Sequence, residues 1–267
     1  MLALPFKRTT SALPFKRYKE DAMRKWILVV SVTLLGVSAM AQSCLADAKA
    51  KGLNVGTSPD YPPFESLDKD NKMIGFDIDL MNLIGTEAGI KINMVGQSFD
   101  GLIPALLSKK IDVIAAGLTI TDERKKSVDF TQPYISGPNV VIIRKETAGI
   151  AKLDDLSGKK VAVQIGSAQE KIASGVKGAE VKSYNLYTDA ALAVNTRQAD
   201  ALIVHRFVGR AFVKQYPDLK IVAELNQVDT GLALRKDCAD LRRAIDAAID
   251  KLEKSGKMDE LATKWFK

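Results

Sequence analysis

The stretch Gly75-Phe-Asp-Ile-Asp-Leu-Met-Asn-Leu-Ile-Gly-Thr-Glu-Ala88 decides the fold class. Its apolar residues recur at helical spacing up to Gly89, which predicts an amphipathic helix that ends at this glycine. A short strand is predicted before the helix, at residues 53–57, and another after it, at residues 91–95. A helix between two strands is the repeating unit of an α/β fold, so this stretch predicts a sheet covered by helices.

The alternation continues along the rest of the chain. A proline-rich loop is predicted at residues 59–64, because prolines interrupt both regular elements. Further strands are predicted at residues 112–115, 140–144, 161–164, 181–184, 201–204 and 231–234. Further helices are predicted at residues 100–109, 122–127, 169–174, 189–197, 206–215 and 240–266, the last with a break at Gly256. Strands separated by helices of this length predict parallel sheets wrapped by helices.

Composition limits the classes of function. Of 267 residues, 46% are hydrophobic and 27% are charged, which is typical of a globular chain. Two cysteines and one histidine are too few for a disulfide scaffold or a zinc site, so no metal and no cofactor are expected. Residues 1–48 hold seven Lys/Arg against three acids, so much of the net charge of +7 belongs to the leader. The rest has an ordinary surface, and no nucleic-acid partner is expected.

The leader is predicted to contain a secretory signal peptide. From Met23, two basic residues precede an apolar run that is shorter than the ~20 residues of a membrane-spanning helix. Small residues allow cleavage after Ala41 or after Ala48, so the signal peptide covers residues 23–41 or 23–48; a retained membrane anchor is the alternative. A direct repeat in residues 1–22 suggests that this segment is a misassigned start.

The two cysteines leave two questions open. Cys44 follows Ala41-Gln42-Ser43, which has a small residue before the cysteine as lipoprotein sites do, although Gln42 fits that pattern poorly. Lipid anchoring through Cys44 is therefore the alternative to free secretion. Cys238 has no intramolecular disulfide partner except Cys44, and a buried free thiol is expected.

Residues 75–88 resemble the signature helix of the bacterial extracellular solute-binding proteins of family 3, the polar amino-acid receptors of ABC importers. Other stretches resemble family motifs in family order: Tyr61-Pro-Pro-Phe-Glu65, Phe99-Asp-Gly-Leu-Ile-Pro-Ala-Leu106, Ala116-Gly-Leu-Thr-Ile-Thr-Asp-Glu-Arg124, Val128-Asp-Phe-Thr-Gln-Pro-Tyr134, Leu156-Ser-Gly-Lys-Lys-Val-Ala-Val163 and Lys264-Trp-Phe266. The resemblance implies an α/β, two-lobed periplasmic binding protein fold of type II (Venus-flytrap), with lobes joined by two crossover segments near residues 136–139 and 227–231. The implied lobes are residues 50–136 plus 232–267, and residues 137–231.

The same resemblance implies a function. The chain is expected to be a periplasmic, non-enzymatic receptor that captures a polar amino acid or derivative between its lobes and delivers it to an ABC permease in the inner membrane. A monomer is expected. One alternative is an enzyme similar to cyclohexadienyl dehydratase, which shares the fold, but the position of that enzyme's cleft glutamate is Val208 here, and valine cannot act as an acid or base.

The resemblance also implies a set of ligand-binding residues. Arg124 matches the arginine that binds the ligand α-carboxylate, and Gly117 and Thr119 lie beside it; a solvated charge is the alternative for Arg124. Tyr61 and Phe99 match two aromatic positions that enclose the ligand side chain, and a core position is the alternative for Phe99. In the second lobe, the turn Gln164-Ile-Gly-Ser-Ala-Gln169 contributes three positions, namely Gln164, Ser167 and Ala168.

Two positions depart from the family pattern. His205 stands where an aspartate usually binds the ligand ammonium, and Ser58 stands where several relatives have an aspartate, which leaves Asp60 and Asp229 as candidate carboxylates. Two interpretations stay open. Either the alignment slips locally and an ordinary amino acid is bound, or the site prefers an opine, a dicarboxylate or a keto acid that lacks a free ammonium. In both cases, titration of His205 predicts pH-dependent binding between about pH 8 and 6.

Overall fold

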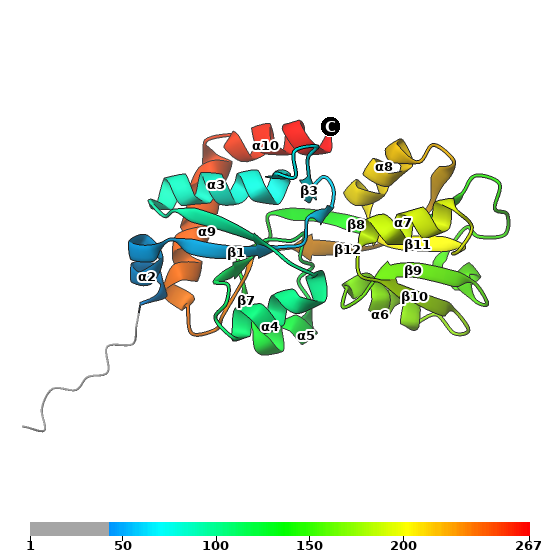
Figure 1. Ribbon diagram of the computed structural model, residues 1–267, viewed down its shortest axis with the longest axis horizontal. Coiled ribbons are helices and arrows are strands. Elements are labelled where there is room, and N and C mark those ends of the chain that lie inside the picture. The colour runs from blue at the N-terminus through cyan, green and yellow to red at the C-terminus, as the bar shows by residue number, and fades with distance from the viewer. Residues whose placement is uncertain (1–42) are drawn as a thin grey trace, which may run out of the picture. The chain divides into compact units, whose positions relative to one another are not determined.

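A computed structural model describes residues 43–267 (Figure 1). These residues form one compact unit. The predicted start at Met23 and the apolar run of the signal peptide lie outside the described residues. Within residues 43–267, no helix has both the length and the apolar composition needed to cross a membrane.

The described chain contains the following elements. The helices are α2 (Cys44–Lys51), α3 (Phe76–Ala88), α4 (Leu102–Leu107), α5 (Asp122–Ser127), α6 (Ala168–Ser174), α7 (Tyr187–Asn195), α8 (Arg206–Gln215), α9 (Ala239–Lys254) and α10 (Lys257–Phe266), with 3-10 turns η1 (Phe99–Gly101) and η2 (Leu153–Leu156). The strands are β1 (Leu53–Thr57), β2 (Asp60–Tyr61), β3 (Glu65–Leu67), β4 (Met73–Ile74), β5 (Ile92–Gly96), β6 (Val113–Ile114), β7 (Asp129–Phe130), β8 (Ile135–Arg144), β9 (Lys160–Gln164), β10 (Glu180–Tyr184), β11 (Ala201–His205), β12 (Leu219–Thr230) and β13 (Ala233–Leu234).

The first sheet has five strands in the order β5-β1-β6-β13-β7. β1 pairs with β5 and β6 in parallel, whereas β13 pairs with β6 and β7 in antiparallel. The expectation of a parallel sheet is therefore wrong at this edge. β13 enters this sheet from β12 of the second sheet, so it is not part of a strand–helix–strand unit, which is the connection that makes neighbouring strands parallel.

The second sheet has the order β10-β9-β11-β8-β12. β9 is parallel to β10 and β11, but β8 is antiparallel to β11 and β12, so this sheet is also mixed. β12 was not predicted from the sequence. It is an edge strand, largely half-buried or exposed, with two irregularities in its pairing, so its residues lack the apolar alternation of a strand with one buried face.

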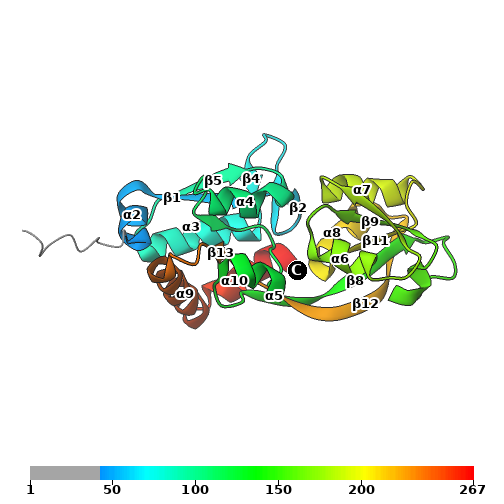
Figure 2. The same ribbon diagram turned by 90° about the horizontal axis from the view of Figure 1, so that it is seen from below.

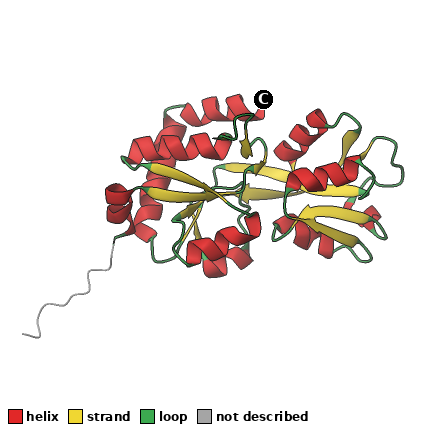
Figure 3. Cartoon of the chain, in the orientation of Figure 1, coloured by secondary structure: helices red, strands yellow, loops and turns green. Residues whose placement is uncertain are grey.

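Strands β8 and β12 connect the part of the molecule that is built on the first sheet to the part that is built on the second sheet (Figures 1 and 2). The two segments that were expected as crossovers lie opposite each other in these strands, with Pro138 paired to Gln227 and Ile135 paired to Thr230. Helices lie above and below the strands of the first sheet (Figure 3). The C-terminal helices α9 and α10 pack against α3, beside the first sheet.

A third sheet, β2-β3-β4, occurs where a proline-rich loop was predicted. β2 has only two residues, Asp60 and Tyr61, and its partners are Ser66 and Glu65 of β3. Such short strands give no detectable periodicity in the sequence, because a period of two needs at least four residues to be seen. The sheet matters for function because it fixes the positions of Asp60 and Tyr61.

The N-terminal helix α2 is linked to the rest of the chain by a disulfide that the sequence analysis did not expect. Cys44 and Cys238 form a disulfide, so the expected free thiol is wrong. Cys238 is buried as expected, and it precedes α9, against which α2 packs. The folded unit thus includes residues 43–48, which were expected to belong to the leader.

Candidate ligand-binding pocket

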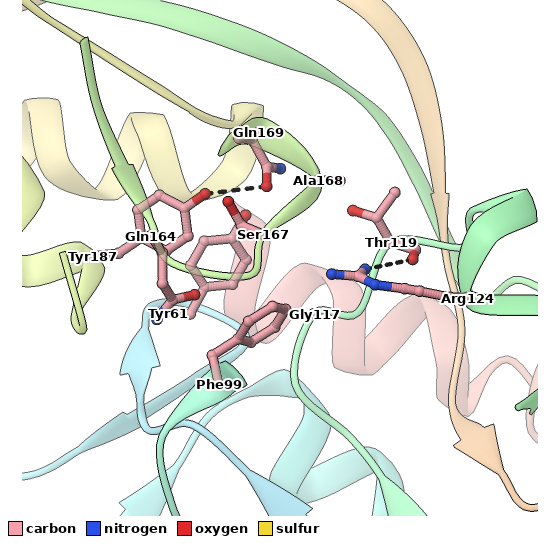
Figure 4. Close-up of a pocket in the computed structure, with 10 residues that line it drawn as sticks. All are labelled: Tyr61, Phe99, Gly117, Thr119, Arg124, Gln164, Ser167, Ala168, Gln169 and Tyr187. Atoms are coloured by element: carbon pink, nitrogen blue, oxygen red, sulfur yellow. Dashed lines mark hydrogen bonds between the residues drawn. The ribbon is translucent and has the colours of Figure 1, made fainter. Parts of the chain in front are cut away.

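Eight of the ten predicted ligand-binding residues line one pocket (Figure 4). They are Tyr61, Phe99, Gly117, Thr119, Arg124, Gln164, Ser167 and Ala168, and two unpredicted residues, Gln169 and Tyr187, complete the lining. The cavity has a volume of about 10 Å³, which is about the space that a single water molecule needs. The pocket is therefore tightly closed in this conformation.

Residues from both sides of the molecule contribute to the lining. The first group comes from β2, η1, α5 and the loop that follows β6, and it supplies the aromatic rings of Tyr61 and Phe99 and the guanidinium of Arg124. The second group comes from the end of β9 and the first residues of α6 and α7. The end of a parallel strand and the helix that follows it are where open α/β sheets bind ligands.

Arg124 extends into the pocket from the side opposite Tyr187 (Figure 4). Its Nη1 donates to the Thr119 carbonyl at 2.7 Å, and its Nη2 donates to the Gly166 carbonyl at 3.2 Å. The guanidinium carbon lies 5.4 Å from the Phe99 ring centroid, within cation–π range. Burial lowers the pKa of Arg124 to about 10, so the side chain remains charged at neutral pH.

No acid balances this charge within the pocket. The pocket lining contains no Asp or Glu, and Arg124 forms no ion pair within residues 43–267. Its neighbours Lys125 and Lys126 on α5 are exposed, whereas Arg124 is half-buried. A partly desolvated cation without a counter-ion favours an anionic ligand group beside it.

The aromatic side chains form the walls of the pocket. The rings of Tyr61 and Tyr187 have centroids 4.9 Å apart, and Phe99 lies beside Tyr61 (Figure 4). The Tyr187 hydroxyl donates to Gln169 Oε1 at 3.1 Å. Tyr187 is the first residue of α7, two positions before the predicted helix start, so its side chain could be placed only by knowing how α7 packs.

The turn before α6 is organised largely by its own side chains. The Ser167 hydroxyl accepts from the Glu170 amide at 3.0 Å, as an N-cap does, and a Glu170 carboxylate oxygen accepts from the Gly166 amide at 2.8 Å. The amides of Ala168 and Gln169, the first two residues of α6, have no partner within the helix. These two N–H groups are the donors that the turn offers to the pocket.

Gly117 brings its backbone close to the Tyr61 ring. Its φ is 52°, and a Cβ at this position would lie 2.8 Å from ring atoms of Tyr61, so a larger residue would disturb the wall. The Gly117 amide donates to Asp77 Oδ2 at 2.8 Å, which also accepts from the Tyr134 hydroxyl at 2.8 Å. Burial raises the pKa of Asp77 to about 7 and raises the pKa of adjacent Glu65 well above its usual value.

His205 does not line the pocket. It is the N-cap of α8, where Nδ1 accepts from the Phe207 amide at 3.4 Å, and its ring lies 5.5 Å from those of Phe64 and Phe207. Burial, followed by the charge of Arg206, lowers the pKa of His205 to about 4, so the imidazole is neutral at physiological pH. Within residues 43–267, Nε2 has no hydrogen-bond partner.

Ser58 does not line the pocket, and hydrogen bonds through Asp60 connect it to two lining residues. The Ser58 hydroxyl donates to Asp60 Oδ1 at 2.8 Å, and Asp60 Oδ2 accepts from Gln164 Nε2 at 3.1 Å and from the Tyr187 amide. Asp60 is 5% exposed, and burial raises its pKa. Asp229, the other candidate carboxylate, accepts from Ser136 between β8 and β12, away from the pocket.

No cluster of three or more metal-ligating side chains occurs within residues 43–267. Val208, at the position considered for a catalytic acid, is fully buried in α8. Together, the two sheets and the shared pocket define a two-lobed ligand-binding protein.

The chain belongs to the bacterial extracellular solute-binding proteins, family 3, whose model matches residues 53–267. It is 34% identical to the arginine-binding extracellular protein ArtP of Bacillus subtilis over 254 residues, which cover 91% of this chain and 98% of ArtP. This match and the solved structures below confirm the predicted family and the α/β two-lobed fold.

Two solved structures are similar along most of their length. A mutant of ArgBP from T. maritima has a TM-score of 0.81 and 42% identity, covering 85% of this chain and 99% of ArgBP. The ancestral amino acid-binding protein AncCDT-1, a precursor of cyclohexadienyl dehydratase, has a TM-score of 0.80 and 35% identity, covering 84% of this chain and 100% of its own. Both the receptor and the precursor of an enzyme therefore share this architecture.

Proposed function

We propose that this protein is a non-catalytic receptor that binds a polar amino acid or amino-acid derivative through its carboxylate at Arg124. The observation that carries the proposal is the half-buried guanidinium of Arg124, which lies in a pocket without an acid. Arginine presents five N–H donors in a planar fork, and two of its N–H groups face the carbonyls of Thr119 and Gly166. The remaining donors can hold a carboxylate.

The aromatic walls would enclose the rest of the ligand. Tyr61 and Phe99 provide flat apolar surface, and the same ring faces attract a cation. ArtP is named as arginine-binding, and ArgBP has been solved with arginine bound. In this chain, a cationic ligand group would meet aromatic faces, because the pocket lining contains no carboxylate. Arginine and compounds that lack a free ammonium are therefore both candidate ligands.

Binding is proposed to close the two lobes. The lobes comprise residues 50–136 with 232–267, and residues 137–231, and β8 and β12 form the hinge between them. Contacts that join the two sides support this mechanism, namely Arg124 with Gly166 and Glu123 with Lys171. Such contacts exist only when the lobes are closed, so a ligand that touches both sides shifts the equilibrium toward closure.

Catalysis is not part of the proposal, although AncCDT-1 is similar. Acid–base chemistry needs a titratable group at the substrate, and the pocket lining has no Asp, Glu or His. The two tyrosines of the lining, Tyr61 and Tyr187, have pKa values raised by burial, so they stay protonated. A receptor fits these properties better than a dehydratase does.

The receptor is proposed to act in the periplasm as a monomer. Export by the predicted signal peptide would place it beside an ABC permease of the inner membrane, to which it would deliver the ligand. The name of the family, which describes its members as extracellular, supports export.

A thermal-shift screen tests the proposal. The panel contains the twenty amino acids, opine-type conjugates, dicarboxylates and keto acids, and a binder of the native state raises the melting temperature by mass action. At least one carboxylate compound should bind with a Kd in the micromolar range or tighter, equivalent to about −8 kcal/mol or better. Turnover of prephenate or arogenate would contradict the proposal and favour the dehydratase.

A further inference from the structure

The disulfide between Cys44 and Cys238 connects residues that are 194 positions apart. It fastens α2 to the start of α9, which packs against α3 beside the first sheet. The family model matches residues 53–267, so Cys44 and α2 precede the matched range, whereas Cys238 lies within it. It bears directly on how the precursor is processed.

Further contacts hold α2 on α9. The Ser43 hydroxyl donates to Asp240 Oδ2 at 2.6 Å, and the Leu45 amide donates to the same oxygen at 3.1 Å. Ser43 also caps α2, since its Oγ accepts from the Ala46 amide at 3.1 Å. Ala48 is 2% exposed and belongs to the same core as Cys238. Residues 43–48 are therefore an integral part of the folded unit.

We propose that the precursor is cleaved after Ala41 and not after Ala48, and that Cys44 forms a disulfide instead of carrying a lipid. Cleavage after Ala48 would remove Ser43 and the first five of the eight residues of α2, including Cys44, and it would leave Cys238 unpaired in the core. Lipid attachment would use the Cys44 sulfur for a thioether, and one sulfur cannot form both bonds. The inference rests on the proposed export but not on the identity of the ligand.

The chemistry involves two separate reactions. Water hydrolyses the Ala41–Gln42 peptide bond, which leaves a carboxylate on Ala41 and an amino group on Gln42. The thiols of Cys44 and Cys238 then lose two protons and two electrons to a disulfide oxidant, which is reduced to two thiols. Such oxidation is characteristic of the periplasm and not of the cytosol.

The test uses the full chain with its leader, expressed in a bacterium and released from the periplasm by osmotic shock. Intact mass and N-terminal sequencing should show a chain that begins at Gln42 and carries no lipid. Iodoacetamide should label no cysteine in the unfolded protein before reduction, and both cysteines after reduction.

The variant Cys44→Ser separates the disulfide from lipidation. Under our proposal it is still cleaved after Ala41, its Cys238 is labelled on unfolding without reductant, and its melting temperature falls by about 5–10 °C. A lipoprotein precursor would lose its processing with the same change, because the modified cysteine is required. Lys49→Ser, an exposed substitution in α2, is the matched control and should change neither processing nor labelling.

Three results would overturn the inference: a chain that begins at Lys49, a lipid on Cys44, or labelling of the wild-type cysteines without reductant. A precursor of unprocessed mass would overturn the export on which the inference depends. Ligand binding by the isolated protein, measured in the thermal-shift screen, would still decide the proposed function separately.

Discussion

Asp60 and Gln164 are hydrogen-bonded beside the pocket, with 3.1 Å between Asp60 Oδ2 and Gln164 Nε2. Asp60 lies on β2 and Gln164 ends β9, so the bond joins the two sides of the molecule. The same carboxylate accepts from the Tyr187 amide and from Ser58. The Asp60 carboxylate therefore stabilises the closed conformation through these hydrogen bonds and does not bind a ligand ammonium.

We expect Asp60→Asn to weaken ligand binding. The amide replaces one acceptor by a donor that faces the donors of Gln164 and Tyr187, and a hydrogen bond to a charged group contributes about 1.5–3 kcal/mol. A loss of affinity of about 10–100-fold is predicted, mainly as faster release measured by stopped-flow fluorescence. Asp122→Asn removes the same charge from an exposed position on α5 and should leave release unchanged. Equal release rates for Asp60→Asn and wild type would show that the bond does not hold the closed state.

Binding should be insensitive to His205 between pH 8 and 6, contrary to the expectation from the sequence. The folded pKa is lowered to about 4 by burial, so the ring stays neutral throughout this range. The earlier expectation assumed a solvated ring in the cleft, whereas the ring packs between Phe64 and Phe207. Titration calorimetry at pH 6, 7 and 8 with buffers of matched ionisation enthalpy checks this, and a several-fold change that is absent from His205→Asn would contradict it.

His205 should instead affect stability at acidic pH. Because its folded pKa lies below the unfolded value of about 6.5, its neutral form favours folding, and this stabilisation is lost as pH falls from about 6.5 to 4. The loss amounts to about 3–4 kcal/mol at most. His205→Asn keeps an N-cap acceptor for α8 but does not titrate, so urea unfolding should show a shallower decline. Parallel declines for variant and wild type would remove His205 as the cause.

Asp77 should produce a pH dependence of the opposite sign. Its folded pKa of about 7 lies above the unfolded value, so its stabilising contribution is complete below about pH 4 and is lost as pH rises through 7. Asp77→Asn keeps an oxygen for the amide of Gly117 and should flatten this loss in urea unfolding between pH 5 and 8. An unchanged slope in Asp77→Asn would show that this carboxyl does not cause the pH dependence.

Much of the fold could be predicted because strong local patterns coincide with its elements. The predicted bounds of β1, α5 and α8 match the structure, since each is delimited by residues that start or stop an element. β12 could not be predicted, because an exposed edge strand needs no apolar alternation. β13 was expected in a parallel sheet, but the chain reaches it from β12 of the second sheet, and the periodicity of a sequence does not report which sheet the preceding strand belongs to.

The site was predictable where a motif fixes the backbone, as at Gly117 and Arg124. The site was less predictable where side-chain packing determines which of several nearby residues faces the pocket. His205 is the last residue of β11, but its side chain caps α8, and the pocket position beside Gln169 is filled by Tyr187 from another helix. No local sequence pattern distinguishes a His205 side chain that faces the pocket from one that caps α8.

Arg124→Lys should recover only part of the binding that Arg124→Ala loses. Lysine keeps a positive charge but lacks the two-pronged donor that a carboxylate accepts. We expect Arg124→Ala to lose about 100-fold or more in affinity and Arg124→Lys to lose about 10-fold, both with unchanged circular dichroism. Lys125→Ala, from the exposed neighbour on α5, is the control.

The most direct measurement of the carboxylate site is a double cycle by titration calorimetry. The best binder of the screen and its carboxamide analogue are each titrated into wild type and Arg124→Ala. If Arg124 binds the carboxylate, wild type should lose about 100-fold in affinity for the carboxamide, while Arg124→Ala should bind both compounds almost equally. An Arg124→Ala protein that prefers the acid over the carboxamide as strongly as wild type does would contradict the account.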